Sequence, residues 1–205
     1  MKTTLIVNPK GGCGKSTIAT NLASYYARAG APVALVDYDP QKSSLAWLEQ
    51  RGASGNPIHG IDGGAKRISL PGATERVVMD SPARIEAGQM ERLFKFSDSV
   101  LLPVLPSPVD IRAAAQFLGE LMLSGLLKSA RVGLIANRVR ENTLIYVNLE
   151  RFLRRVKLPL VAHLREAQNY NRAAISGRGI FDMPPHLVNK DLAQWKPLIR
   201  WVEKG

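Results

Sequence analysis

The stretch Lys10-Gly11-Gly12-Cys13-Gly14-Lys15-Ser16-Thr17 decides the fold. An apolar run precedes it at residues 3–8 and a segment of helical period follows at residues 15–29, so the glycines are expected to join a strand to a helix. Such a loop lets backbone N–H groups surround phosphate oxygens at the positive end of the helix. Lys15 is expected to reach the β- and γ-phosphates, and the Ser16 hydroxyl to bind Mg²⁺.

Two acidic motifs follow further apolar runs. Residues 33–41 read Val-Ala-Leu-Val-Asp-Tyr-Asp-Pro-Gln, and residues 77–83 read Val-Val-Met-Asp-Ser-Pro-Ala. The second is typical of a Walker B strand, whose terminal acid, here Asp80, holds Mg²⁺ through a water because Mg²⁺ in phosphate sites keeps much of its hydration shell. Taken alone, the acids Asp37 and Asp39 also fit a solvated turn, but a preceding phosphate loop favours a site.

The loop fits the general pattern G-x-x-x-x-G-K-[ST] only in part, because Pro9 stands at the first glycine position. With its additional Lys10, it resembles the deviant Walker A motif of the ParA/MinD family of P-loop ATPases, which includes small ParA-like partition proteins and McdA-like carboxysome-positioning proteins. In that family the extra lysine reaches the partner's phosphates across a nucleotide-sandwich dimer. The resemblance thus implies ATP and Mg²⁺ as cofactors, an ATP-bound homodimer, and catalytic roles for Lys10 and Lys15.

The resemblance assigns roles to other residues as well. It places Asp39 to orient or activate the attacking water, Asp37 near the metal, and residues 81–88 as a switch segment that senses the γ-phosphate. Residues 135–138, Ile-Ala-Asn-Arg, resemble the family's adenine-recognising strand end. The implied nucleotide-binding residues are Gly11, Gly12, Cys13, Gly14, Lys15, Ser16, Thr17, Asn137 and Arg138, and the implied metal ligands are Ser16, Asp37 and Asp80.

The rest of the 205-residue chain alternates short apolar runs with segments of helical period. This pattern predicts an α/β fold, a single-domain doubly wound mostly parallel sheet with helices on both faces, over residues 1–205. Strands are expected at residues 3–8, 33–37, 76–80, 99–105, 131–137 and 158–162, and helices at residues 15–29, 43–51, 87–95, 111–127, 144–156 and 191–203. Residues 52–72 are expected to form loops with one edge strand at most, and residues 177–189 an ordered connection.

The formal net charge of +11 indicates a polyanionic partner. The excess is C-terminal, since residues 129–205 carry 14 Lys and Arg against 6 Asp and Glu. We expect non-specific double-stranded DNA as the partner, although a solvated basic surface would show the same pattern. The residues expected to contact DNA are Arg151, Arg154, Arg155, Lys157, Arg172, Arg178, Lys196 and Arg200.

Two alternatives to a DNA-bound positioning ATPase remain open. Leu192, Trp195, Leu198, Ile199 and Val202 form an apolar stripe that fits either a core-facing helix or the interfacial helix of a MinD-like membrane protein. A biosynthetic P-loop enzyme would share the fold. The lone Cys13 favours a reducing cytoplasm, where DNA binding implies association with the nucleoid. The resemblance also implies slow hydrolysis that a ParB-like or McdB-like adaptor protein stimulates.

Overall fold

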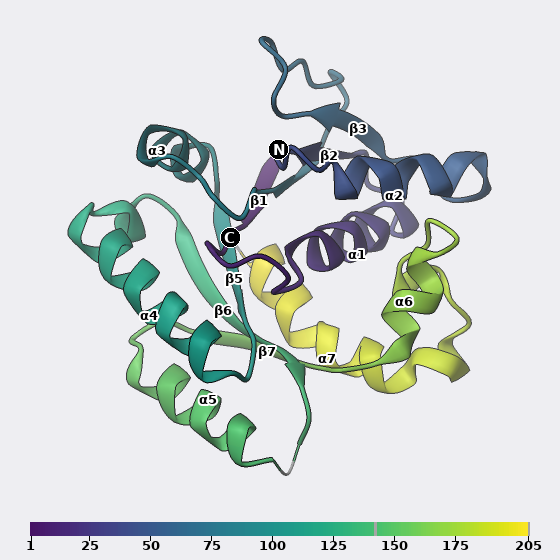
Figure 1. Cartoon of the computed structure of the whole chain (residues 1–205). Helices are drawn as coiled ribbons and strands as arrows, with labels where there is room; N and C mark the ends of the chain where they lie inside the picture. Colours follow the sequence, from purple (N-terminus) through teal and green to yellow (C-terminus); the bar gives the residue numbers. More distant parts are fainter. Residues whose placement is uncertain (142, 205) are drawn as a thin grey trace.

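A single seven-stranded sheet forms the centre of the computed structural model, which describes residues 1–141 and 143–204 (Figure 1). Every pair of neighbouring strands is parallel, and the strand order is β3-β2-β4-β1-β5-β6-β7. The strands are β1 (Lys2–Ile6), β2 (Val33–Asp37), β3 (His59–Asp62), β4 (Arg76–Asp80), β5 (Ser99–Val104), β6 (Arg131–Val139) and β7 (Leu160–Arg165). The predicted α/β fold with a parallel sheet is therefore confirmed.

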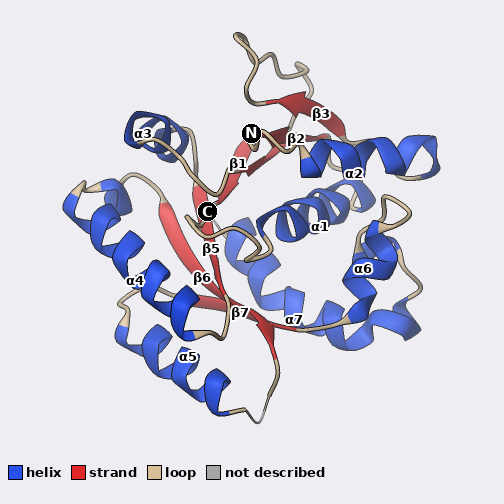
Figure 2. Ribbon diagram, in the orientation of Figure 1, coloured by secondary structure: helices blue, strands red, loops and turns tan. Residues whose placement is uncertain are grey.

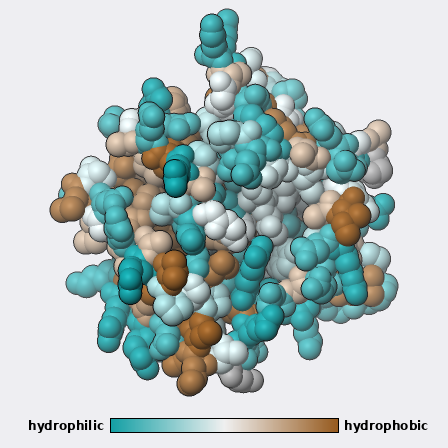
Figure 3. Space-filling view, in the orientation of Figure 1, coloured by the Kyte–Doolittle hydropathy of each residue, from teal (hydrophilic) through white to brown (hydrophobic). Residues whose placement is uncertain are grey.

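Helices cover both faces of the sheet (Figure 2). In the same orientation, hydrophilic side chains are spread over the surface, with smaller hydrophobic patches among them (Figure 3). One core cluster packs the sheet against α3 (Ala87–Lys95), α4 (Pro108–Leu123) and α5 (Leu144–Arg155). The other packs it against α1 (Lys15–Arg28), α2 (Ser43–Arg51) and α7 (Pro185–Glu203), with Tyr170 of α6 (Gln168–Ala174) at its edge. Strands buried on both faces are apolar throughout, which is why β2 and β5 lack a polar-apolar alternation.

The sequence pattern misplaced several boundaries in the C-terminal half. Helix α7 begins at Pro185 instead of residue 191, because proline suits the first helical turn, and α6 was not predicted at all. Strand β7 lies at Leu160–Arg165, later than the predicted residues 158–162. Helix α4 begins at Pro108, with Ser107 as its N-cap, and ends at Leu123 before a separate 3₁₀ turn.

The apolar stripe of α7 faces the core. Trp195 and Leu198 are fully buried, Ile199 and Val202 nearly so, and Leu192 packs against the same cluster. These side chains are not available to a membrane surface, so the interfacial alternative for this helix is wrong. Within residues 1–141 and 143–204, moreover, every helix is too short or too polar to cross a bilayer.

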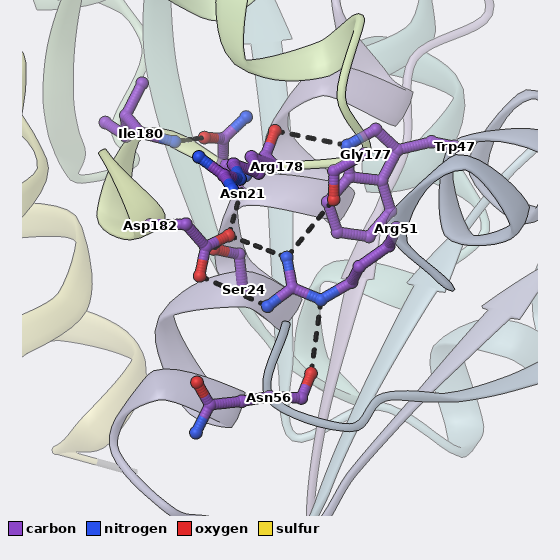
Figure 4. A network of polar contacts seen from close by, with 10 residues as sticks. Asn21, Ser24, Trp47, Arg51, Asn56, Gly177, Arg178, Ile180 and Asp182 are labelled. Carbon is purple, nitrogen blue, oxygen red and sulfur yellow. Dashed lines mark hydrogen bonds and ion pairs between the residues drawn. The ribbon is translucent and has the colours of Figure 1, made fainter. Parts of the chain in front are cut away.

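A buried ion pair ties the start of the α7 region to α1 and α2 (Figure 4). Arg51 at the end of α2 places its guanidinium nitrogens 2.6 and 3.1 Å from the two carboxylate oxygens of Asp182. Ser24 of α1 donates a hydrogen bond to the same carboxylate, over 2.8 Å. Gly177 lies so close that a Cβ atom there would be 2.0 Å from the backbone nitrogen of Arg51. Segment 177–182 is thereby held against both helices.

Candidate functional site

The glycine-rich loop connects β1 to α1 at the carboxyl edge of the sheet. Gly12 and Gly14 have φ angles of 76° and 95°, a backbone conformation that side chains other than glycine rarely adopt. Gly14 is also the N-cap of α1, and a Cβ atom there would lie 2.4 Å from the Asn137 amide nitrogen. Glycine is therefore required both for the turn and for the close approach of β6.

Lys15 lies at the first position of α1 and is buried. Its ammonium donates to the carbonyl oxygens of Asn8 and Lys10, each at 3.1 Å, so the side chain folds back across the loop. Asn8 is fixed in turn, because its amide donates to the Pro103 carbonyl over 2.6 Å and accepts from the Lys10 N–H over 2.8 Å. These carbonyl oxygens therefore hold the lysine side chain across the loop.

An open groove of about 590 Å³ lies over this loop. The lining residues come from the ends of four strands and are Gly11, Gly12, Gly14, Lys15, Ser16, Thr17, Asp39, Pro40, Gln41, Ser43, Pro82, Ala83, Arg84 and Arg138. Backbone amides, one buried lysine and a helix N-terminus suit a polyphosphate. Asp39 is half-buried in the groove, where its carboxylate accepts a hydrogen bond from the Gln41 N–H.

The carboxylate of Asp80 meets the requirements of a hydrated Mg²⁺. One oxygen accepts a 2.6 Å hydrogen bond from the Ser44 hydroxyl, while the other is buried and has no hydrogen-bond partner among the described residues. Burial raises the pKa of Asp80 to about 6, and the nearby Asp37 raises it too, whereas Ser44, Ser16 and Lys15 lower it. A cation with its waters would satisfy the unpaired oxygen and stabilise the ionised form.

Asp37 is already engaged by backbone. One oxygen accepts from the Asp39 N–H, and the other accepts from the N–H groups of Ser44 and Leu45 at 2.9 and 3.2 Å. This carboxylate therefore anchors the first turn of α2 beside Asp80, an arrangement that favours a positioning role over direct contact with a metal. Its predicted place among the metal ligands stays a prediction.

Asn137 and Arg138 lie at a bulge near the end of β6. The pairing with β7 shifts between Ala136 and Val139, and Arg138 has a φ angle of 50°. Asn137 donates to the Cys13 carbonyl over 2.8 Å, and both residues line a cavity of about 150 Å³ that also includes Thr17. The cavity adjoins the groove through Thr17 and Arg138. The structure thus brings Arg138 to the groove and Asn137 to the adjoining cavity, and adenine recognition stays a prediction.

Two other residues of the loop, Lys10 and Cys13, are absent from the described lining of the groove. Lys10 is exposed and is absent from the described lining of the groove in its own protomer. Cys13 is fully buried, and burial raises the pKa of its thiol. Cys13 therefore contributes its backbone alone. The sequence pattern did not predict that Asn8 contacts Lys15 or that Ser44 contacts Asp80. Each of the two lies close in sequence to a predicted motif, which could have indicated it.

The predicted DNA-contacting residues do not form one surface. All eight have exposed side chains. One group, Arg151, Arg154, Arg155 and Lys157, lies on or just after α5 on one side of the sheet. The other, Arg172, Arg178, Lys196 and Arg200, belongs to α6, α7 and their connection on the opposite side. Arg178 in addition lines a small cavity beside Ser16 and Thr17.

The sequence matches the family profile described as the CobQ/CobB/MinD/ParA nucleotide binding domain over residues 4–180, most of the chain. The chain belongs to this family. Among its relatives is the Maintenance of carboxysome distribution protein A of Gloeobacter kilaueensis, 31% identical over 185 residues that cover 85% of this chain and 82% of that protein. The Halothiobacillus neapolitanus protein of the same name is 28% identical and covers 88% and 87% of the two chains. The chain is thus a ParA/McdA-like partition or positioning ATPase of the CobQ/CobB/MinD/ParA family.

Solved structures of the family share the fold. A plasmid partition protein of Borrelia burgdorferi bound to AMPPNP superposes with a TM-score of 0.76 at 17% identity, covering 97% of this chain and 98% of that one. MinD of Aquifex aeolicus, in complex with MinC, gives a TM-score of 0.75 at 19% identity, covering 100% and 96%. At these identities the likeness establishes the fold alone.

Proposed function

We propose that this chain is a switch ATPase that dimerises with ATP, binds DNA without sequence preference, and positions a cargo such as a plasmid, a chromosome or a carboxysome. The observation that carries the proposal is the prearranged phosphate loop, with Lys15 folded over it and the unpaired Asp80 oxygen beside it. The names of the relatives, which concern carboxysome distribution, favour positioning over a biosynthetic reaction.

In the proposed reaction, water attacks the γ-phosphorus while the bond from that phosphorus to the bridging oxygen breaks, which leaves ADP and inorganic phosphate. Asp39 accepts a hydrogen bond from the water, orients it and takes up the proton that the water loses as its oxygen bonds to phosphorus. Lys15 and the loop amides neutralise the developing charge, together with Lys10 of a second copy. Mg²⁺ held by Ser16 and Asp80 would supply further neutralisation of the β- and γ-phosphate oxygens.

Asp39→Ala is expected to trap the ATP-bound dimer, because the variant keeps the phosphate-binding groups but no longer orients the water. Hydrolysis should fall about 10²- to 10⁴-fold, the range for loss of a general base. Light scattering with ATP should give about twice the monomer mass of 22.5 kDa. As a control, Asp39→Ala combined with Lys10→Ala should remain monomeric. An Asp39→Ala protein that stays at the monomer mass, or hydrolyses ATP normally, would contradict the proposal.

The DNA surface is tested by comparing the two basic groups. We expect Arg154→Glu with Arg155→Glu to weaken DNA retention and flatten its salt dependence, because α5 presents three arginines on one exposed face. Nucleotide binding should be unchanged. The matched variant, Lys196→Glu with Arg200→Glu on α7, lowers the net charge of +11 by the same amount. Equal losses in both variants would show that the α7 group contributes to DNA retention as much as the α5 group does, and full retention by the α5 variant would remove α5 from the DNA surface.

A further inference from the structure

Arg84 lies in the segment between β4 and α3, four residues after Asp80. Its side chain is exposed and lines the phosphate groove together with Lys15 and Asp39. Throughout residues 1–141 and 143–204, the structure gives this guanidinium neither a hydrogen bond nor an ion pair. An arginine that faces a groove built for phosphate, without a protein partner, is available to a ligand.

The backbone that carries Arg84 is fixed against the glycine-rich loop. Ser81 and Pro82 are buried, and the Ser81 N–H donates to the Ile6 carbonyl over 3.2 Å. The Cβ atom of Ala83 is 3.9 Å from the position that a Cβ atom would occupy at Gly11. Arg84 is therefore presented from a short segment anchored at the phosphate loop and not from a long, freely moving connection.

The strand order fixes the end of the groove at which Arg84 lies. Strands β4 and β2 lie to one side of β1, so Arg84 and Asp39 flank the same end of the groove. Strand β6 lies to the other side and carries Arg138, next to the smaller cavity. Asp39 is the proposed water-orienting group, so the terminal phosphate belongs at its end. Arg84 thus flanks the terminal phosphate and Arg138 the base.

From this geometry we infer that Arg84 binds the γ-phosphate within its own protomer and makes the site distinguish ATP from ADP. The inference rests on the proposed ATPase function and adds a residue to it. A planar guanidinium donates two parallel hydrogen bonds to phosphate oxygens, and those oxygens are absent from ADP. Arg84 also borders a second cavity, of about 610 Å³ between α3 and α4, so it has room to leave the groove once phosphate departs.

The test compares affinities for Mg²⁺-AMPPNP and Mg²⁺-ADP by titration calorimetry. A Lys10→Ala background keeps the protein monomeric, so that a residue acting across a dimer has no effect. Arg84→Ala should weaken AMPPNP binding about 10- to 100-fold, the range for lost charge-assisted hydrogen bonds, and leave ADP binding within about twofold. Arg84→Lys should restore part of the preference, because it keeps the charge and loses the planar fork. Arg92→Ala, an exposed arginine of α3 outside the groove, should change neither affinity.

Several outcomes overturn the inference. An Arg84→Ala protein with an unchanged preference for AMPPNP, or one in which both affinities fall together, would show that Arg84 does not read the γ-phosphate. If the preference for AMPPNP over ADP changes only in protein that can dimerise, Arg84 contacts the γ-phosphate of the other protomer and not its own. If Arg84→Ala does not fold, Arg84→Lys and Arg84→Gln provide the same comparison. Parental protein that binds neither nucleotide would instead refute the proposed function itself.

Discussion

Lys15→Ala is expected to abolish measurable nucleotide binding, the largest functional effect expected for a single substitution in the chain. The ammonium is buried at the start of α1 and is oriented across the loop by two carbonyl oxygens. Loss of two charge-assisted hydrogen bonds to phosphate, at about 1.5–3 kcal/mol each, lowers affinity on the order of 10²- to 10⁴-fold. Calorimetric titration with ATP and with ADP measures the loss.

A matched control removes one lysine charge outside the groove. Lys128 is an exposed lysine in the 3₁₀ turn Leu126–Lys128, outside the groove, and Lys128→Ala should bind both nucleotides normally. Thermal unfolding of the Lys15→Ala protein should show a cooperative transition, because otherwise the loss of binding would reflect unfolding. Folded Lys15→Ala protein that binds ATP within about threefold of the parent would contradict the site.

The largest effect on stability is expected from Arg51→Ala, which leaves the Asp182 carboxylate without its main partner. Breaking a buried, doubly hydrogen-bonded ion pair costs about 3–5 kcal/mol. Burial raises the pKa of Asp182, but the hydrogen bonds from Arg51, Gly179 and Ser24 outweigh it and leave the pKa below its usual value. The contribution is therefore present at neutral pH and lost as the pH falls through that lowered pKa, when Asp182 takes up a proton.

Urea unfolding at pH 7 and at acidic pH measures this prediction. The free energy of unfolding of Arg51→Ala should lie below the parent's by the stated amount at pH 7, and the gap should narrow in acid. Arg51→Lys keeps the charge but not the bidentate geometry and should fall between the two. Arg67→Ala, an exposed arginine, should match the parent. A loss under about 1 kcal/mol for Arg51→Ala would show that the pair is not stabilising.

The sequence predicted the fold, and it predicted residues that the structure places around the groove, because both depend on local patterns. Apolar runs mark the buried strands, and the glycines and the acid at residue 80 stand next to those runs. The short α6, Gln-Asn-Tyr-Asn-Arg-Ala-Ala, was missed because it shows no apolar period. The start of α7 was missed because its first three side chains, at residues 185–187, are exposed. Hydrogen bonds between a side chain and backbone groups, such as those that the Asp37 carboxylate accepts, cannot be predicted from residue type.

The sequence also did not predict which basic residues share a surface in the folded chain. Residues 151–157 and 172–200 belong to one basic region of the sequence. In the fold, α5 covers one face of the sheet and α6 and α7 the other, so nearness along the chain does not give a shared surface. Arg84 falls within residues 81–88, which the resemblance assigned to γ-phosphate sensing, but it was not singled out there. Nothing in the residues around it shows that its side chain faces the groove.

The last helix has one side in the core and the other in solvent, which fixes how its sequence is free to vary. In a saturation mutagenesis library scored by protein abundance, substitutions at Val188, Asp191, Trp195, Leu198 and Val202 should be depleted. Those at Lys190, Lys196 and Arg200 should persist. The depletion profile would rise and fall about every 3.6 positions. Sequence variation among natural homologues should show the same period along the helix.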